Sequence, residues 1–229
     1  MKAIVGCEES QVVTLALRQV GIEAYSCDLK PCSGGHPEYH IQDDIRNHLH
    51  KDWDLGIFHP DCTYLTCSAE WAYKDGPYHQ KVKPGTLIGK ERREARVAAI
   101  GFVQELWAAP ISFKAIENPV GVLSSRWMEP TQFIQPYEYG DDASKITCLW
   151  LDNLPPLQPT NMVVPRLAPS KDGRRYLLRW SNQTNSGQNR ESPSENRAEI
   201  RSKTYQGRAN AMADQWGNYL LNQTEAIAS

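Results

Sequence analysis

The chain has 229 residues, a net charge of −2 and a hydrophobic fraction of 40%, which is the composition of an ordinary soluble globular protein. No apolar run approaches the roughly 20 residues that a membrane-spanning helix needs, and the apolar run at 2–6 is too short for a secretion signal. These totals predict one cytoplasmic domain over 1–229, and the negative charge argues against tight non-specific binding to nucleic acid by the chain as a whole.

Strands and helices are predicted to alternate along most of the chain. Apolar runs bounded by turn residues predict strands, and apolar residues three and four positions apart predict helices. The expected strands are 2–6, 22–28, 40–45, 54–58, 112–117 and 146–151. The expected helices are 11–20, 90–107, a short one at 119–126 and a last one at 205–216, followed by a frayed tail at 222–229. This alternation predicts a Rossmann-like α/β fold, with a mostly parallel sheet and helices on both faces.

The segment 59–89 is too long for a simple connection between a strand and a helix, so we expect a lid or a substrate loop. It carries Trp71, Tyr73 and Tyr78. These rings could stack on a base, or they could pin the loop to the body of the protein.

The segment 155–203 is polar and shows little periodicity, so it is expected to be ordered only if other elements pack on it. Residues 166–208 contain ten Lys or Arg against four Asp or Glu, a local charge of +6. Such a segment could follow a phosphate backbone or bind a phosphorylated small substrate, and a solvated arginine-rich loop is the simpler alternative.

Six cysteines in a chain with no export signal are expected to be reduced thiols. Four residues have the spacing C-x4-C-x3-H-x3-H, which resembles a zinc site: Cys27, Cys32, His36 and His40. The two pairs lie too close together for a zinc finger with its own helix, so no metal is expected.

Two apolar strands end in residues that can perform chemistry. The first is followed by His59-Pro60-Asp61-Cys62, and the second by Glu117-Asn118-Pro119. Open α/β sheets bind ligands at the carboxyl ends of their strands, so a thiol and a carboxyl delivered there form a candidate site. Taken alone, a cysteine after an apolar strand is more often a small buried apolar residue than a nucleophile.

Several segments together resemble the C5-cytosine DNA methyltransferases, in particular their small phage- and prophage-type members. Besides the two strand ends, the similar segments are Cys7-Glu8-Glu9-Ser10, Ala115-Ile116-Glu117-Asn118-Pro119-Val120-Gly121, Lys145-Ile146-Thr147-Cys148-Leu149-Trp150-Leu151 and Arg201-Ser202-Lys203-Thr204-Tyr205. The resemblance covers most of 1–152 and 200–217, and it implies the Rossmann-like class I fold of methyltransferases that use S-adenosylmethionine.

The resemblance also implies a mechanism. The Cys62 thiolate would add to carbon 6 of cytosine, because carbon 5 is otherwise a poor nucleophile. Glu117 would protonate ring N3 or donate a hydrogen bond to it, and an apolar strand end can keep a carboxyl protonated for that task. Asn118 would orient Glu117 or line the pocket.

The methyl donor implied by the resemblance is S-adenosylmethionine. Its expected binding residues are Gly6, Cys7, Glu8, Asp28, Asp44, Ile45 and Pro60. Asp28 would hold the ribose hydroxyls, and Asp44 with Ile45 would lie beside the adenine. Taken singly, Asp28 and Asp44 could equally be ordinary helix caps.

This sequence departs from the pattern of that group at three points. Asp61 stands beside Cys62, where a negative charge raises the pKa of a thiol. The first loop has no glycine-rich fingerprint, and only about 50 polar residues occupy the place of a full target-recognition region. The expected substrate-binding residues are Arg174, Arg175, Arg179 and Lys145.

The substrate stays open at this point. DNA bound with little sequence specificity is the first candidate, and a free pyrimidine nucleotide such as dCMP is the second. A catalytically silent nucleic-acid-binding protein with the same fold is the alternative outside the enzymes.

Overall fold

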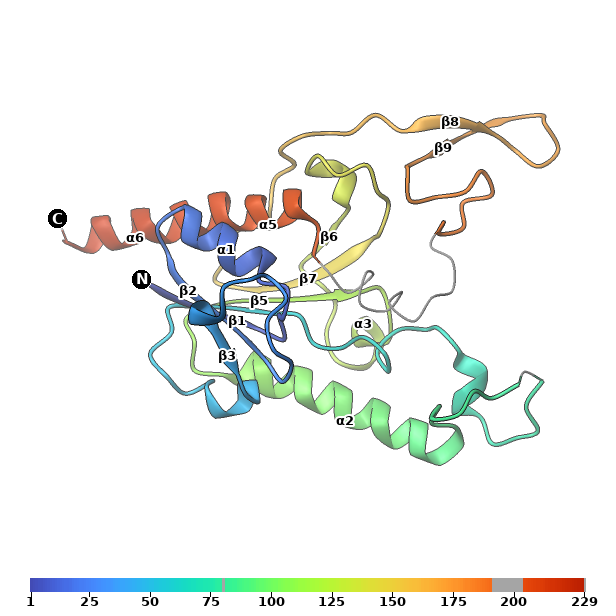
Figure 1. Cartoon of the computed structure of the whole chain (residues 1–229), viewed down its shortest axis with the longest axis horizontal. Coiled ribbons are helices and arrows are strands. Elements are labelled where there is room, and N and C mark those ends of the chain that lie inside the picture. Colours follow the sequence, from blue (N-terminus) through green and yellow to red (C-terminus); the bar gives the residue numbers. More distant parts are fainter. Residues whose placement is uncertain (80, 191–203, 229) are drawn as a thin grey trace.

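A computed structural model describes residues 1–79, 81–190 and 204–228, and in these residues seven strands form one sheet in the order β3-β2-β1-β4-β5-β7-β6 (Figure 1). The strands are β1 (Lys2–Gly6), β2 (Glu23–Asp28), β3 (His40–Gln42), β4 (Leu55–Phe58), β5 (Phe113–Pro119), β6 (Gln132–Ile134) and β7 (Thr147–Asp152). Only β7 runs antiparallel to its neighbours, β5 and β6. This topology is that of the Rossmann-like class I methyltransferase fold, as the sequence predicts.

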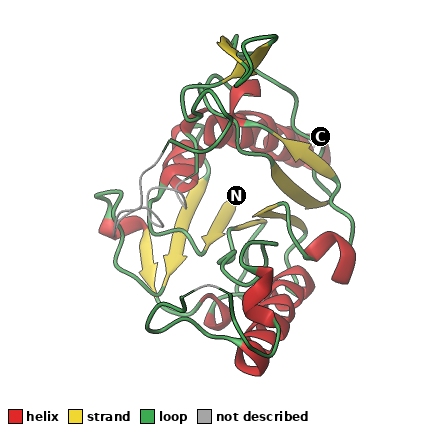
Figure 2. Ribbon diagram, turned by 90° about the vertical axis from the view of Figure 1, so that its right-hand side faces the viewer, coloured by secondary structure: helices red, strands yellow, loops and turns green. Residues whose placement is uncertain are grey.

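Helices cover both faces of this sheet (Figure 2). One face carries α1 (Val12–Gln19), α5 (Gln206–Met212), the π-helical turn η5 (Ala213–Gly217) and α6 (Asn218–Ala228). The other carries α2 (Gly89–Ala108) and α3 (Leu123–Arg126). Neighbouring residues of a strand point to opposite faces, so Ala3 and Val5 pack in the first core and Ile4 in the second. In the part of the chain described, no helix is both long and apolar enough to cross a bilayer.

A two-stranded hairpin stands apart from the main sheet (Figure 1). Its strands are β8 (Arg166–Pro169) and β9 (Tyr176–Arg179), paired antiparallel. The remaining regular elements are the 3₁₀ turns η1 (Pro37–Tyr39), η2 (Ile45–Asn47), η3 (Glu70–Tyr73) and η4 (Pro136–Glu138). The hairpin orders much of the segment that lacks periodicity, and residues 191–203 of that segment lie outside the described part of the chain.

The structure corrects the expected elements at several places. Strands β6, β8 and β9 were not expected, and the helix expected at 119–126 begins only at Leu123, because β5 continues to Pro119. The strand expected at 40–45 ends at Gln42, because Asp44 Oδ1 accepts a hydrogen bond of 3.0 Å from Arg46 N and starts a 3₁₀ turn. The tail expected at 222–229 is helical as far as Ala228.

Aromatic residues in the long loop after β4 pin it to α2. The ring of Tyr73 lies under the guanidinium of Arg96, whose Cζ is 3.4 Å from the ring centroid. Arg96 also donates hydrogen bonds to the carbonyl oxygens of Tyr64 and Thr66. Trp71 packs edge-on against Tyr78 at 5.9 Å between ring centroids. Tyr73 therefore pins the loop to the body of the protein, which was the alternative to stacking on a base.

Candidate active site at the carboxyl edge of the sheet

The carboxyl ends of three neighbouring parallel strands, β1, β4 and β5, meet at one edge of the sheet. The register pairs Gly6 with Phe58 and Phe58 with Ile116, so the residues that follow them, Cys7, His59 and Glu117, start side by side. The strand order reverses between β1 and β4 at this edge. In open α/β sheets this is the position of the ligand crevice.

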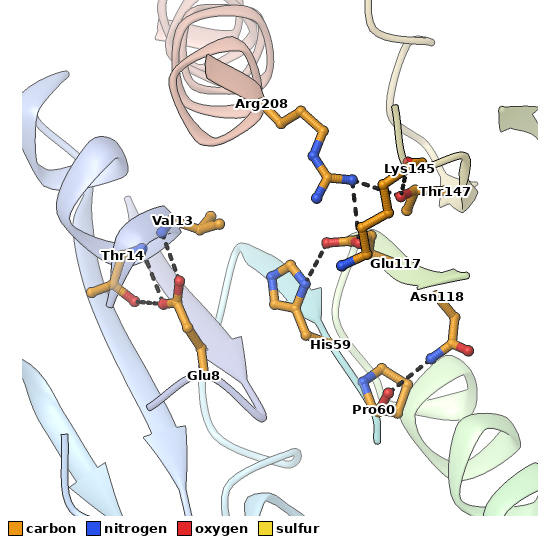
Figure 3. Close-up of polar contacts among 10 residues, drawn as sticks. All are labelled: Glu8, Val13, Thr14, His59, Pro60, Glu117, Asn118, Lys145, Thr147 and Arg208. Carbon is orange, nitrogen blue, oxygen red and sulfur yellow. Dashed lines mark hydrogen bonds and ion pairs between the residues drawn. The ribbon is translucent and has the colours of Figure 1, made fainter. Parts of the chain in front are cut away.

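Glu117 is the centre of a buried polar network at the end of β5 (Figure 3). Its Oε2 lies 2.9 Å from Nδ1 of His59, and its Oε1 accepts a hydrogen bond of 3.4 Å from Nη1 of Arg208. The same Arg208 nitrogen donates to Thr147 Oγ1 at 2.7 Å. Two residues that are distant in sequence, His59 and Arg208, thus hold one carboxyl, and Thr147 holds Arg208 in turn.

The charge state of Glu117 differs from the sequence-based expectation. Burial alone raises the pKa of this carboxyl, but Arg208, His59 and Lys145 outweigh burial and hold the pKa well below its usual range. Glu117 is therefore ionised at neutral pH. The apolar strand end does not keep it protonated, because a fully buried guanidinium lies against it.

Four buried polar atoms at this edge have no hydrogen-bond partner among the described residues: His59 Nε2, Asn118 Oδ1, Arg208 Nε and Arg208 Nη2. A buried donor or acceptor without a partner costs about 1–3 kcal/mol. A ligand with polar edges, such as a nucleobase, would remove that cost. The edge thus has the chemistry of a binding site.

Cys62 is delivered by the loop after β4 and is partly exposed. Asn118 Nδ2 donates a hydrogen bond of 2.8 Å to the carbonyl oxygen of Pro60, which ties the end of β4 to the end of β5. The Cys62 carbonyl oxygen accepts from Leu65 N at 3.0 Å and from Thr66 N at 3.1 Å. The thiol and the carboxyl of Glu117 therefore come from two strand ends that are joined directly.

The loop of Cys62 is also fastened to the segment after β5. Val122 N donates to the Leu65 carbonyl oxygen at 2.8 Å. A Cβ on Gly121 would lie 2.0 Å from that same oxygen, so only glycine permits this approach. Asp61 faces its own turn, since its Oδ1 accepts from Thr63 N at 2.9 Å and from Thr63 Oγ1 at 2.8 Å.

Glu8 follows β1 and serves the first helix. Its Oε1 accepts from Val13 N at 2.6 Å, and its Oε2 accepts from Thr14 N at 3.2 Å and from Thr14 Oγ1 at 2.7 Å. Burial raises the pKa of Glu8, and these hydrogen bonds and the nearby His59 only partly oppose that rise. Glu8 thus supplies the acceptors that the amino end of α1 needs.

The neighbouring residues of the first loop also have structural reasons for their identity. A Cβ on Gly6 would lie 2.7 Å from Phe58 and 2.9 Å from Ile45, so glycine is required here by packing. Cys7 has a backbone φ of 60°, and burial raises the pKa of its thiol to about 12. The Cys7 thiol is therefore not an alternative nucleophile.

Of the acidic residues expected at the donor, Asp28 is the better placed. Asp28 is half-buried at the carboxyl end of β2 and accepts one hydrogen bond of 2.9 Å, from Lys30 N. Both oxygens of Asp44 face Arg46, at 3.0 Å from its backbone nitrogen and 3.4 Å from Nη1. Ile45 is 4% exposed and packs in the core. Asp44 is therefore the cap of the 3₁₀ turn η2, as the second interpretation of this residue expected.

The expected substrate-binding residues are not all together. Lys145 lies near enough to Glu117 to lower its pKa, whereas Arg174 and Arg175 are exposed at the hairpin tip. Arg179 departs from the expected phosphate contact: its Nε donates to the Asn185 carbonyl oxygen at 3.1 Å and its Nη1 to that of Leu178 at 2.8 Å. Arg179 thus links β9 to the segment that follows it by hydrogen bonds to backbone oxygens.

The residues of the zinc-like spacing are engaged separately. His36 Nδ1 lies 3.0 Å from Glu38, and His40 bonds to Ser26 Oγ at 2.8 Å and to the Lys30 carbonyl oxygen at 2.8 Å. In the described ranges no three His, Cys, Asp or Glu residues converge in a way that could hold a metal ion.

His59, Arg208 and Thr147 belong to the network of Glu117 but were not among the predicted site residues. His59 is visible in the sequence as the first residue after the apolar run of β4. For Arg208 the signal is a charged residue on the apolar face of the last helix, beside Ala209, Ala211 and Met212, all of them buried. A cation on a buried helix face indicates a buried partner.

Comparison with known proteins finds similarity in fold only. No protein-family model and no curated protein matches the chain. Among solved structures, a candidate DNA modification methyltransferase encoded within a prophage of E. coli aligns with a TM-score of 0.41 and 11% identity, over 66% of this chain and 46% of that one. A mutant of DNMT2 from Spodoptera frugiperda aligns with a TM-score of 0.36 and 14% identity, over 71% of this chain and 54% of that one. The chain thus spans about half the length of these two proteins.

Proposed function

We propose that the chain is an S-adenosylmethionine-dependent methyltransferase that modifies carbon 5 of cytosine in DNA through a covalent adduct with Cys62. The observation that carries the proposal is the joined pair of strand ends. β4 delivers a partly exposed thiol and β5 a buried carboxylate, and the hydrogen bond from Asn118 to Pro60 holds the two ends together. His59 and Arg208, which contact the carboxylate, also have buried nitrogens without a hydrogen-bond partner among the described residues.

A thiol and a carboxyl have complementary tasks on a pyrimidine ring. When the Cys62 thiolate adds to carbon 6, electron density moves across the ring toward N3. Glu117 stabilises that change from the N3 side by passing a proton to N3. Carbon 5 then carries enough electron density to take a methyl group, and the Cys62 sulfur leaves when a water molecule takes the proton from carbon 5.

S-adenosylmethionine supplies an electrophilic methyl group when it is bound. The chain fits it best at Asp28, whose carboxylate stands at the carboxyl end of β2 and accepts one hydrogen bond, from Lys30 N, so it can also accept from ribose hydroxyls. Cys7 and Glu8 follow the neighbouring strand. Asp44 and Ile45 fit less well, since one is engaged by Arg46 and the other by the core.

DNA is favoured over a free nucleotide by the position of the cationic hairpin tip. Lys171, Arg174 and Arg175 are exposed at the turn between β8 and β9, and this hairpin stands apart from the sheet that carries Glu117 (Figure 1). The single phosphate of dCMP lies close to its base, whereas a polymer can contact both places. A duplex would have to extrude the cytosine to reach Cys62.

The test incubates the purified protein and a labelled methyl donor with duplex DNA or with dCMP, followed by mass spectrometry of the nucleosides. We expect 5-methylcytosine in the DNA. Cys62→Ala should bind DNA as the wild type does and transfer no methyl group. Label in dCMP alone would favour the nucleotide enzyme, and DNA binding without transfer by the wild type would favour the silent binder.

A further inference from the structure

His59 occupies an unusual position for a core histidine. It follows β4 directly, its side chain is 12% exposed, and its Nδ1 lies 2.9 Å from Glu117 Oε2. Its Nε2 is buried, has no hydrogen-bond partner among the described residues, and points away from Glu117 toward the side on which Glu8 lies (Figure 3). Nδ1 thus contacts the carboxylate of Glu117, and Nε2 points to the opposite side of the ring.

The proposed chemistry leaves Glu117 without a proton to give. Addition of a thiolate to carbon 6 is favoured when N3 is protonated, but Arg208 and His59 keep Glu117 ionised. Arg208 cannot supply the proton, because a guanidinium does not deprotonate in proteins. Imidazole is the side-chain group that exchanges a proton between pH ~5 and ~8.

We propose that His59 is the proton carrier of this site and that it acts through Glu117. This inference rests on the proposed function. As Cys62 Sγ bonds to carbon 6, Glu117 takes the Nδ1 proton of the His59 imidazolium, and His59 becomes neutral. Glu117 passes a proton on to N3, toward which the electron pair displaced from the 5,6 double bond moves. The pair returns to the ring when carbon 5 attacks the methyl group. A water molecule then takes the carbon 5 proton, the sulfur leaves with its bonding pair, and the N3 proton goes back by the same route.

The charged groups around His59 suit this role. Glu117 faces it from β5, and the charge of His59 also reaches Glu8, which follows β1. Arg208 of α5 and Lys145 from the segment before β7 act on the same carboxylate from the far side. The carboxylate of Glu117 stabilises a protonated imidazole, and the two cations favour release of its proton toward a base that accepts it.

The decisive variant is His59→Asn, because an asparagine amide can donate a hydrogen bond to Glu117 from nearly the place of Nδ1 but cannot give up a proton. The measurement is kcat/KM for methyl transfer to DNA between pH ~5 and ~9. We expect a fall of roughly 10²- to 10⁴-fold, the size of a general acid contribution. The decrease of the wild-type rate with rising pH, due to loss of the imidazolium, should vanish in the variant. Wild-type rates and pH dependence in His59→Asn would overturn the proposal.

The matched control is His36→Asn, which alters an exposed histidine whose Nδ1 also faces a carboxylate, Glu38, at 3.0 Å. This variant should keep both the rate and the pH profile. If the wild type and His36→Asn transfer no methyl group either, the proposed function fails. If both are active and His59→Asn matches them, only the proton-carrier role fails.

A second measurement does not depend on turnover or on the folding of His59→Asn. The imidazole signals of His59 are followed by NMR against pH in the wild type and in Glu117→Gln. The pH dependence of the His59 signals should differ between the two proteins, because the carboxylate that lies 2.9 Å from Nδ1 is absent from the variant. An unchanged titration in Glu117→Gln, or no titration of His59 in the wild type, contradicts the role.

Discussion

Two buried carboxyls at one edge of the sheet have opposite charge preferences. Glu8 is 4% exposed and Glu117 is 8% exposed, so burial alone would raise the pKa of both. Glu8 receives hydrogen bonds from neutral donors, two backbone N–H groups and a hydroxyl, and its pKa stays raised. Glu117 faces Arg208 and His59, and its pKa is depressed. The charge of the partner, more than the depth of burial, decides the protonation state.

The largest effect should come from Glu117→Gln, which removes the charge but keeps the shape. It leaves the guanidinium of Arg208 buried without a counter-charge, and breaking a buried pair in this way costs about 3–5 kcal/mol. Methyl transfer should fall at least about 10²-fold. Urea unfolding and the transfer assay measure the two losses. A stability equal to that of the wild type would show that Arg208 is not held by Glu117.

Arg208→Met should destabilise less, by about 3 kcal/mol, the lower end of the range for a broken buried pair. A buried carboxylate that has lost its cation can become neutral by taking up a proton, whereas a buried guanidinium cannot become neutral by losing one. Glu117 would then resemble Glu8. Urea unfolding at several pH values tests this, because the cost of Arg208→Met should shrink as the pH falls. A cost that does not depend on pH would contradict the explanation.

Glu8→Gln is expected to cost about 0.5–2 kcal/mol, the range for loss of a helix cap. The amide retains one acceptor but sets a donor against the N–H groups of Val13 and Thr14. Urea unfolding should place this loss below that of Glu117→Gln. The reverse order would mean that the helix cap contributes more than the buried ion pair.

The smallest expected effect is the change of these stability losses with pH, which should differ between Glu8→Gln and Glu117→Gln. The depressed pKa of Glu117 gives stability that is complete above the unfolded value of about 4.3 and is lost as the pH falls through the folded pKa. The raised pKa of Glu8 acts the other way, because its folded form binds the proton more tightly. Between pH ~4.3 and ~5, below the range in which imidazoles titrate, the stability of the wild type relative to Glu8→Gln should therefore fall, while that relative to Glu117→Gln stays level. If the two stability differences changed with pH in the same way, the contrast between Glu8 and Glu117 would be wrong.

The elements with strong local patterns could be predicted from the sequence. The apolar runs of β1, β4 and β5 and the amphipathic α1 and α2 lie close to where they were expected. The topology then follows from alternation, and with it the meeting of strand ends that carry Cys62 and Glu117. The strands β6, β8 and β9 were missed because each has only three or four residues and includes Gln, Arg or Pro, so neither a longer apolar run nor a period marks it.

The charge state of Glu117 could not be predicted from local pattern. Its partners come from 58 residues before it and 91 residues after it, and no spacing rule connects them. The sequence shows a carboxyl in an apolar strand, which alone favours protonation. Only the packing of α5 brings a guanidinium to it. The assigned roles of Cys62, Glu117 and Asn118 stay predictions until transfer is measured.

The distant origin of Arg208 has a consequence for synthesis of the chain. Cys62, His59 and Glu117 leave the ribosome well before Gln206, where α5 begins. Until α5 docks beside α1, the carboxylate has no guanidinium to balance it, so burying it is unfavourable and the strand end stays open to water. The last helix thus completes the buried ion pair as well as the core, and a nascent chain carries Cys62 and Glu117 before it has the cation that holds the carboxylate.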